Sequence, residues 1–318
     1  MASVDDAMPG IIPETFGSAR DAMRWYNEER EVLHQVCRLA VKLGDHRSAL
    51  MLMLDWRPMS QAVNARRDML PFAELAIQAT EHVDELDLRA ECFRDVAVVL
   101  TRTGQPDRAR SYFDLAAQAF ERAGNRLGQA QVYRSMALWL EVMSPEERIR
   151  LLGKAVAIAR ETGDQQILAV MLQGLAVGLK WGGRLEEALA VVDESAPLIA
   201  AVPGLAWLEP WVLSVRSMVL AGSGRLAESV DDGARALELY RHDGQLVNEL
   251  NLMLSQGDGL TALGRFGEAA EVWRQFLARA TSPELVRQGD PGTPYTDGAE
   301  IIAQVKAKLA ALVDNGIQ

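Results

Sequence analysis

A short phrase recurs along the chain at nearly constant spacing, and it constrains the fold more than any other feature. The phrase reads Gly-Arg-x-x-Glu followed by Ala or Ser, and it begins at Gly183, Gly224 and Gly264, with a weaker copy at Gly104. Neighbouring full copies lie 41 and 40 residues apart, and the weaker copy lies about two periods before the first of them. A fixed period of this size is the signature of a repeat protein built from stacked supersecondary units.

The copy that is missing from this series should fall near residue 143. The sequence there reads Met143-Ser144-Pro145-Glu146-Glu147-Arg148 and has no glycine. Serine is a good N-cap, proline suits the first helical position, and acidic residues suit the positive end of the helix dipole. We therefore expect a turn that leads into a helix at Pro145, with local chemistry that differs from the other repeats.

A second series of turn residues lies half a period away from the first. Its members are Gly44, Gly124, Gly163, Gly204 and Gly244, with Asp84 midway between the first two. Glycine just past a helix accepts the left-handed conformation that closes the last turn. Between the turns, apolar residues such as Phe93, Val96, Ala97 and Leu100 recur at helical spacing. Two interleaved turn series with one period predict a continuous alternation of helix and turn.

Composition favours an all-α fold. Hydrophobic residues make up 49% of the 318 residues, whereas aromatic residues make up only 6%, and the abundant Ala and Leu are strong helix formers. A single helical hairpin cannot bury both of its faces, but stacked copies can. We predict an all-α protein, a right-handed α-solenoid (superhelix) of helical hairpins with a period of about 40 residues.

The predicted layout has four parts. Residues 1–17 form a leader, 18–44 an N-terminal helical pair, 45–284 six helical hairpins, and 285–318 a loop and a C-terminal helix that covers the end of the stack. The assignment of repeat positions is least regular in residues 45–84. Pro71 should kink the second helix of the first hairpin or make it start late.

The repeat resembles the tetratricopeptide repeat (TPR). The resemblance rests on the Gly-Arg-x-x-Glu-Ala phrase after a column of small residues, which are Ala97, Ala176, Ser217 and Gly257. The long period is similar to that of the repeats in bacterial signal-transduction ATPases. The leader, with Pro13-Glu14-Thr15-Phe16, Ala19 to Trp25 and Glu28-Glu29-Arg30, resembles the junction after the NB-ARC ATPase and winged-helix region of AfsR-type (SARP) actinobacterial regulators.

The resemblance implies a sensor or autoregulatory part in transcription regulation and signal transduction, because the repeats of that family form the C-terminal part of an activator. The family's ATPase motif has no counterpart in these residues: Gly153-Lys154 is followed by Ala155 inside a predicted helix, so it is no phosphate loop. A stand-alone cytosolic TPR adaptor that mediates protein–protein interaction is the alternative interpretation.

The sequence shows no catalytic or metal-binding pattern. The four histidines are scattered, with no pair at i, i+3 or i, i+4 spacing, and no nucleophile motif occurs. Cys37 and Cys92 are expected to be reduced and buried. We therefore expect a binding protein with no cofactor and no metal; an enzyme with a site inside the superhelix is a third interpretation.

Charge and hydropathy limit the classes of partner that we expect. The formal net charge of −11 disfavours binding to a phosphate backbone. No apolar run approaches the ~18 residues of a membrane span, and no basic region marks a signal peptide, so we expect a cytoplasmic protein. The expected partner is a protein or peptide, with a small-molecule effector as an alternative, and the sequence leaves homo-oligomer formation open.

The candidate site is the concave face, which the first helix of each hairpin lines in the tetratricopeptide family. The family's register places a mixed set of polar and aromatic residues there. The set consists of Glu91, Arg94, Arg102, Tyr133, Gln173, Lys180, Trp181, Trp211, Ser214, Asn251 and Asp258, with Thr101 and Glu141 in the same register. Aromatic side chains among charges favour a binding groove; the alternative is that Trp181 packs on the next hairpin and the charges are solvated.

Two polar residues stand in a column that is apolar in other repeats. Arg216 and Gln256 occupy the positions of Val96 and Leu175. A buried arginine without a partner is costly, so Arg216 needs a carboxylate or a carbonyl. Because the two residues lie in adjacent repeats, we expect them to form a local polar cluster that is either structural or part of a site.

Overall fold

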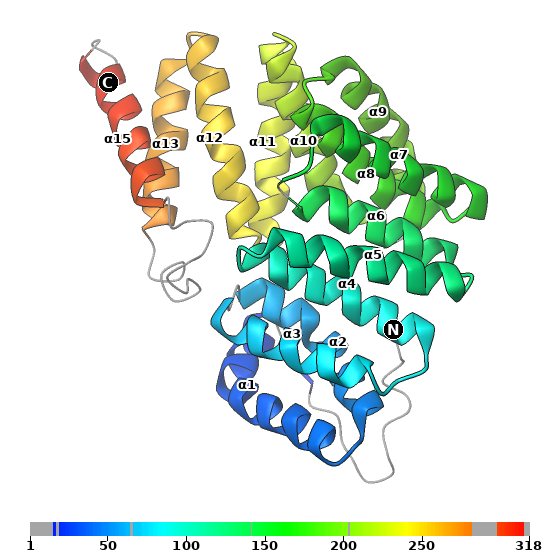
Figure 1. Ribbon diagram of the computed structural model, residues 1–318. Coiled ribbons are helices and arrows are strands. Elements are labelled where there is room, and N and C mark those ends of the chain that lie inside the picture. The colour runs from blue at the N-terminus through cyan, green and yellow to red at the C-terminus, as the bar shows by residue number, and fades with distance from the viewer. Residues whose placement is uncertain are drawn as a thin grey trace.

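The computed structural model is an array of packed antiparallel helices (Figure 1). It describes residues 15–16, 19–63, 66–140, 142–202, 204–281 and 298–314. Within these ranges all regular elements are helical. The helices follow one another from α1 at one end of the array to α15 at the other, and consecutive helices pack together. The predicted all-α solenoid is confirmed.

Helix pairs form the body of the array. In the described residues they are α2 (His46–Val63) with α3 (Arg66–Thr80), α4 (Leu86–Arg102) with α5 (Pro106–Arg122), α6 (Arg126–Trp139) with α7 (Pro145–Thr162), α8 (Gln165–Trp181) with α9 (Leu185–Ala201), α10 (Glu209–Gly222) with α11 (Leu226–His242), and α12 (Leu246–Ala262) with α13 (Phe266–Ala280). A short 3-10 helix, η2 (Ala206–Leu208), precedes α10. Helix α15 (Gly298–Asp314) packs on α13 at the end of the stack.

The segment that was predicted to be an N-terminal helical pair is a single helix. Helix α1 runs from Ala19 to Lys42 without a break. The prediction of a pair was wrong because residues 19–42 contain neither glycine nor proline, the two residues that most often end a helix. Residues 1–14 and 17 of the predicted leader and residues 285–297 of the predicted loop lie outside the described residues.

Glycine closes the turns of both predicted series. The glycines of the two series have φ between 68° and 91°, a left-handed conformation that other residues adopt at a cost. After α4, for example, Gln105 N donates to Leu100 O at 2.9 Å and Gly104 N donates to Thr101 O at 3.1 Å. These bonds satisfy carbonyl groups that the end of a helix would otherwise leave without partners. The turn that contains Asp84 is longer and spans residues 81–85.

Helix α7 begins where the aberrant repeat predicted it. Pro145 is its first residue, and the Ser144 hydroxyl accepts a hydrogen bond from Glu147 N at 3.2 Å. The cap satisfies a backbone donor that the first turn leaves unpaired. Helix α3 starts at Arg66 and includes Pro71, so the late start that Pro71 was expected to impose as one of two alternatives does not occur.

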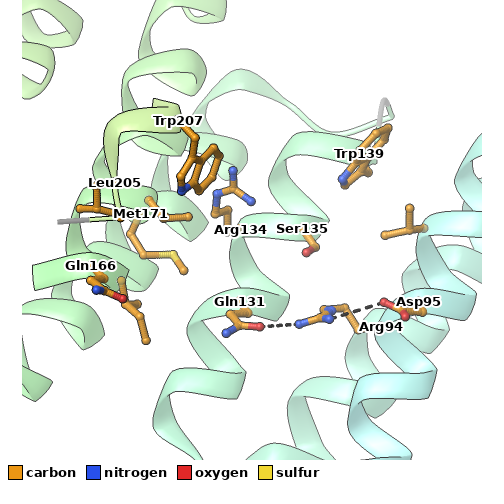
Figure 2. A pocket seen from close by; sticks show the side chains of 14 residues that line it. Arg94, Asp95, Gln131, Arg134, Ser135, Trp139, Gln166, Met171, Leu205 and Trp207 are labelled. Atoms are coloured by element: carbon orange, nitrogen blue, oxygen red, sulfur yellow. Dashed lines mark hydrogen bonds and ion pairs between the residues drawn. The ribbon is translucent and has the colours of Figure 1, made fainter. Parts of the chain in front are cut away.

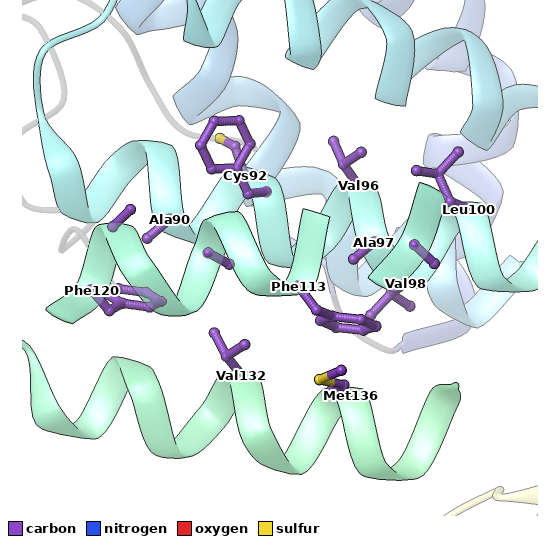
Figure 3. Packing of buried hydrophobic residues seen from close by; sticks show 14 of the residues in the cluster. Ala90, Cys92, Val96, Ala97, Val98, Leu100, Phe113, Phe120, Val132 and Met136 are labelled. Carbon is purple, nitrogen blue, oxygen red and sulfur yellow. The ribbon is translucent and has the colours of Figure 1, made fainter. Parts of the chain in front are cut away.

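Apolar side chains of neighbouring hairpins interleave to form the core. Figure 3 shows Phe113 and Phe120 of α5 directed toward α6, which meets them with Val132 and Met136. All four side chains are buried. The second helix of one hairpin thus packs on the first helix of the next, so each hairpin covers apolar surface that its neighbour cannot bury alone.

Candidate functional site

The first helices of three successive hairpins, α4, α6 and α8, enclose one cavity (Figure 2). Its volume is about 540 Å³, which lies within the range of roughly 300–1,000 Å³ that small-molecule pockets occupy. Gly204, Leu205 and Trp207, from the segment between α9 and α10, complete the lining. The cavity therefore depends on the relative placement of three hairpins and of one connecting segment.

Arg94, a predicted site residue on α4, lines this cavity. Its side chain is buried. The guanidinium Nη1 donates to Gln131 Oε1 at 2.5 Å, and Nη2 lies 2.5 Å from Glu91 Oε2 and 3.5 Å from Asp95 Oδ1. Glu91 was also predicted as a site residue, and its carboxylate here serves to pair with Arg94. The charge of Arg94 is thus matched by two acids.

Arg134, on α6, lines the same cavity but has a different environment. Its Nη2 donates to Gln173 Oε1 at 3.0 Å, and its Nε is buried without an acceptor in the described part of the chain. Desolvation, and then the positive charge of Arg94, lower the pKa of Arg134 to about 10. The side chain is therefore still cationic at pH 7. Gln173, which was predicted as a site residue, is buried and acts here as the acceptor for Arg134.

Two tryptophans that the sequence analysis did not single out flank the cavity. Trp139, at the end of α6, is 42% exposed, and Trp207, in η2, is 54% exposed. In the view of Figure 2 the Arg134 guanidinium is drawn beside the ring of Trp207, and Trp139 lies farther away. Arg102, a predicted site residue, has its guanidinium 5.9 Å from the centre of the Trp139 ring. Trp207 lies between two repeats, where a register counted along the helices does not reach it.

The two tryptophans that were predicted for the groove do not line this cavity. Trp181 is 51% exposed, and the guanidinium of Arg148 lies 5.1 Å from the centre of its ring. Trp211 is partly buried and packs against apolar clusters on both sides. Lys180 donates to Met218 Sδ at 3.4 Å, and desolvation lowers the pKa of its ammonium group.

Other predicted site residues are distributed along the array. Tyr133 packs against core residues, and its ring centre lies 5.7 Å from Lys154 Nζ. Ser214 is buried and shares a hydrogen bond with Tyr240. These contacts hold α6 and α10 to neighbouring helices.

Two further predicted residues lie on α12. Asn251 is exposed there, and Asp258 forms an ion pair with Lys308 of the end helix α15. Neither lines the cavity between α4, α6 and α8. Glu141, which shares the predicted register, lies outside the described residues.

Arg216 and Gln256 each have a partner on α11, and Arg216 has a second one, Asp193, on α9. Arg216 Nη1 lies 3.2 Å from Asp232 Oδ2, and its Nε lies 3.6 Å from Asp193 Oδ1. Gln256 Nε2 donates to Val230 O at 2.7 Å. The carboxylate or carbonyl partner that burial demands is present in both cases, and a shared neighbouring helix, rather than direct contact, brings the two residues into one region.

Within the described residues no three His, Cys, Asp or Glu side chains are placed to hold a metal ion together. Of the helices that the structure describes, none combines the length and the apolar character that a membrane span requires.

No protein-family model matches the chain, and no curated protein matches its sequence. Solved structures do match. One is a Signal Transduction ATPase with Numerous Domains (STAND) protein with a tetratricopeptide repeat sensor from Pyrococcus horikoshii, with a TM-score of 0.61 and 14% identity over 94% of this chain and 49% of that one. Another is aspartyl phosphate phosphatase F from Bacillus subtilis, with a TM-score of 0.56 and 12% identity over 87% and 73% of the two chains.

The fold is TPR-like. At this low identity the likeness establishes the fold alone, and the TPR-like chain spans about half the length of the STAND protein. It agrees with the resemblance that the turn phrase and the column of small residues indicated.

Proposed function

We propose that this TPR-like array is a binding module whose ligand or partner occupies the cavity between α4, α6 and α8. One observation carries the proposal: a single cavity combines a cation, Arg134, that pairs with no acid among the described residues, with two half-exposed indole rings. Concave sites with aromatic side chains and a few well-placed polar groups are typical of recognition surfaces. A protein or peptide is the proposed partner, and a small-molecule effector is the alternative.

The position of the cavity supports a sensor function that acts by mechanical coupling. Each hairpin of a solenoid contacts only its neighbours, so the spacing of α4, α6 and α8 contributes to the curvature of the whole array. A molecule that contacts all three helices binds best to one spacing and therefore shifts the population toward one curvature. We propose that this shift is passed on to whatever the array is joined to.

For the larger context, we propose the sensor or autoregulatory C-terminal part of an AfsR/SARP-like bacterial transcriptional regulator, joined to an NB-ARC ATPase in the cytoplasm. The resemblance of the leader residues to the junction in that family supports this context. So does the likeness to a STAND protein that carries a tetratricopeptide repeat sensor. In this interpretation the chain neither catalyses a reaction nor contacts nucleic acid itself.

Photo-crosslinking in the producing cells tests the binding function. p-Benzoylphenylalanine is placed at Ser135, which lines the cavity, and, as a matched control, at Gln118, which is exposed on the second helix of a hairpin. We expect a discrete adduct from position 135 that position 118 does not give. No adduct at 135, or the same adducts at both positions, would contradict the proposal.

The coding sequence upstream of Met1 tests the regulator context separately. A contiguous segment that encodes a nucleotide-binding ATPase is the expected result. A stop codon directly upstream in the reading frame would refute the regulator context and favour the stand-alone adaptor. Neither result affects the proposal that the cavity is the binding site.

A further inference from the structure

Two arginines of the cavity differ in how their charges are matched. Arg94 pairs with Glu91 and Asp95, whereas Arg134 has one hydrogen bond, to the neutral side chain of Gln173, in the described part of the chain. Keeping an unmatched cation away from water is unfavourable. A site that nevertheless holds one gains strongly when an anion enters it.

We propose that the cavity binds the carboxylate of a ligand whose flat apolar part lies beside Trp207, with Arg134 as the carboxylate-binding group. This inference rests on the proposed binding function and names the chemical class of the ligand.

The donor geometry of Arg134 fits a carboxylate. A guanidinium carries five N–H donors in one plane and binds a carboxylate through two parallel hydrogen bonds. Gln173 uses Nη2, the Nε atom is buried without an acceptor, and Nη1 makes no hydrogen bond within the described residues. Lowering of the Arg134 pKa by desolvation agrees with a cation that lacks a counter-ion.

The charge balance of the cavity favours an anion with a single charge. Asp95 also lines the cavity and would repel a second negative charge. The hydroxyl of Ser135 and the side-chain amide N–H groups of Gln131 offer neutral donors nearby. A phosphate group carries a higher negative charge than a carboxylate, so Asp95 would repel it more strongly, and a carboxylate is the better match.

The remaining wall of the cavity is apolar. It includes Val98, Ile167, Val170, Met171 and Leu205, in addition to the two indole rings. Half-exposed indole rings gain free energy when a flat apolar group covers them. A ligand with a carboxylate at one end and a flat apolar body at the other therefore fits, whether it is a small aromatic acid or the C-terminal aromatic residue of a peptide.

Isothermal titration calorimetry on the full chain tests the inference with two acids and their neutral counterparts. The acids are indole-3-acetate and the peptide acetyl-Gly-Gly-Trp with a free carboxylate; the counterparts are indole-3-acetamide and the peptide amide. We expect at least one acid to bind about tenfold or more tightly than its amide, because hydrogen bonds to a charged group are the stronger ones. Equal binding of acid and amide for both pairs, or no binding of either acid at millimolar concentration, would overturn the inference. The acid that binds identifies the source of the carboxylate.

Variants show whether the binding depends on the named residues. Arg134→Gln and Trp207→Ala should each weaken binding of the acid by about tenfold, and Arg134→Gln should remove most of the preference for acid over amide. Arg126→Gln is the matched control, because Arg126 lies on the same helix but is exposed and pairs with Glu161; its affinity should stay unchanged. Unweakened binding in both Arg134→Gln and Trp207→Ala would refute the assignment.

The folding of the two variants and the result of the photo-crosslinking complete the test. Trp207 is half-exposed, so Trp207→Ala should fold even if Arg134→Gln does not, and circular dichroism melting checks both. If neither acid binds while position 135 still forms its adduct, the inference fails and the proposed binding function stands. If the adduct is absent as well, both fail.

Discussion

At the scale of single residues, the two cavity arginines show how a repeat protein specialises. Arg94 and Arg134 lie one repeat period apart in the sequence, and both line the cavity. In the described part of the chain Arg94 pairs with two acids, whereas Arg134 pairs with none. The same position in two successive hairpins therefore has two different environments, and our proposal assigns recognition to the arginine that lacks an acidic partner among the described residues.

Arg216 provides a test of how buried polar groups stabilise the array. Burial raises the pKa of the Asp232 carboxyl, and the nearby Arg216 opposes that rise. We expect Arg216→Leu to lower the free energy of unfolding by about 1 kcal/mol, a modest value because Arg216 itself is partly exposed. Thermal and denaturant melts measure the change. If Arg216→Leu changed neither the melting nor the ligand binding, the polar cluster around Arg216 would have no structural or functional role.

The same variant has a predictable pH dependence. A carboxyl whose pKa in the folded state exceeds its unfolded value costs stability as pH rises, because the unfolded state releases its proton first. Without Arg216 the pKa of Asp232 should rise further. The stability difference between wild type and Arg216→Leu should therefore grow as the pH is raised from about 4 to about 7. A difference that shrinks over this interval would contradict the assigned ion pair.

The two cysteines should be inert in the folded protein. Burial raises the pKa of the Cys37 thiol to about 11, and Cys92 is buried in the core of the array. Because the thiolate is the reactive species, we expect iodoacetamide at pH 8 to modify neither thiol appreciably in native buffer and both in guanidinium chloride. Mass spectrometry reads out the result. Rapid alkylation of either cysteine in the native protein would show that the packing around it is incorrect.

At the scale of elements, the column of small residues sets how closely the two helices of a hairpin approach. Gly257 of α12 faces the buried indole of Trp273 on α13, and a Cβ placed on this glycine would lie 2.6 Å from Trp273 Cδ1. Gly153 of α7 has open space in the same direction. The two helical glycines therefore have opposite roles.

A matched pair of alanine substitutions tests this difference. Gly257→Ala should destabilise the protein by about 1–3 kcal/mol, because overpacking outweighs the better helix propensity of alanine. Gly153→Ala should stabilise it by about 0.5–1 kcal/mol, because only the propensity term acts. Chemical denaturation of the two variants measures both. The account of the column would be wrong if Gly257→Ala were the more stable of the two.

Most helix boundaries could be predicted from the sequence, because each depends on local chemistry. Gly183 and Gly224 close turns through their own backbone conformation, and Ser144 caps α7 through its own hydroxyl. The N-terminal pair was predicted wrongly, because residues 19–42 contain no glycine or proline that would divide them into two helices. A periodic pattern predicts helix boundaries well only where turn residues separate the helices.

At the scale of the whole molecule, the cavity was only partly predictable. Its existence depends on the curvature of the stack, which no single repeat encodes. Counting backward from the turn glycine placed Arg94 in the site. In the next repeat the same count placed Tyr133 there instead of Arg134, because the reference glycine is missing and Ser144 and Pro145 form the turn. Trp207 was missed because it belongs to a connection between hairpins and not to a helix of the repeat.

The stacked architecture gives the cavity its proposed use. Hairpins that contact only their neighbours transmit a change of spacing along the array, and the cavity bridges three of them through α4, α6 and α8. A ligand at this place acts on the spacing of the hairpins themselves. We therefore propose that the array binds its ligand in this cavity rather than on another face.

A crystal structure of the full chain, grown with whichever acid binds in solution, tests where the ligand binds. The account predicts electron density for the ligand in the cavity between α4, α6 and α8, with its carboxylate on Arg134 and its flat part beside Trp207. Density for the ligand on another face of the array, or an unoccupied cavity at a concentration that saturates binding in solution, would contradict it.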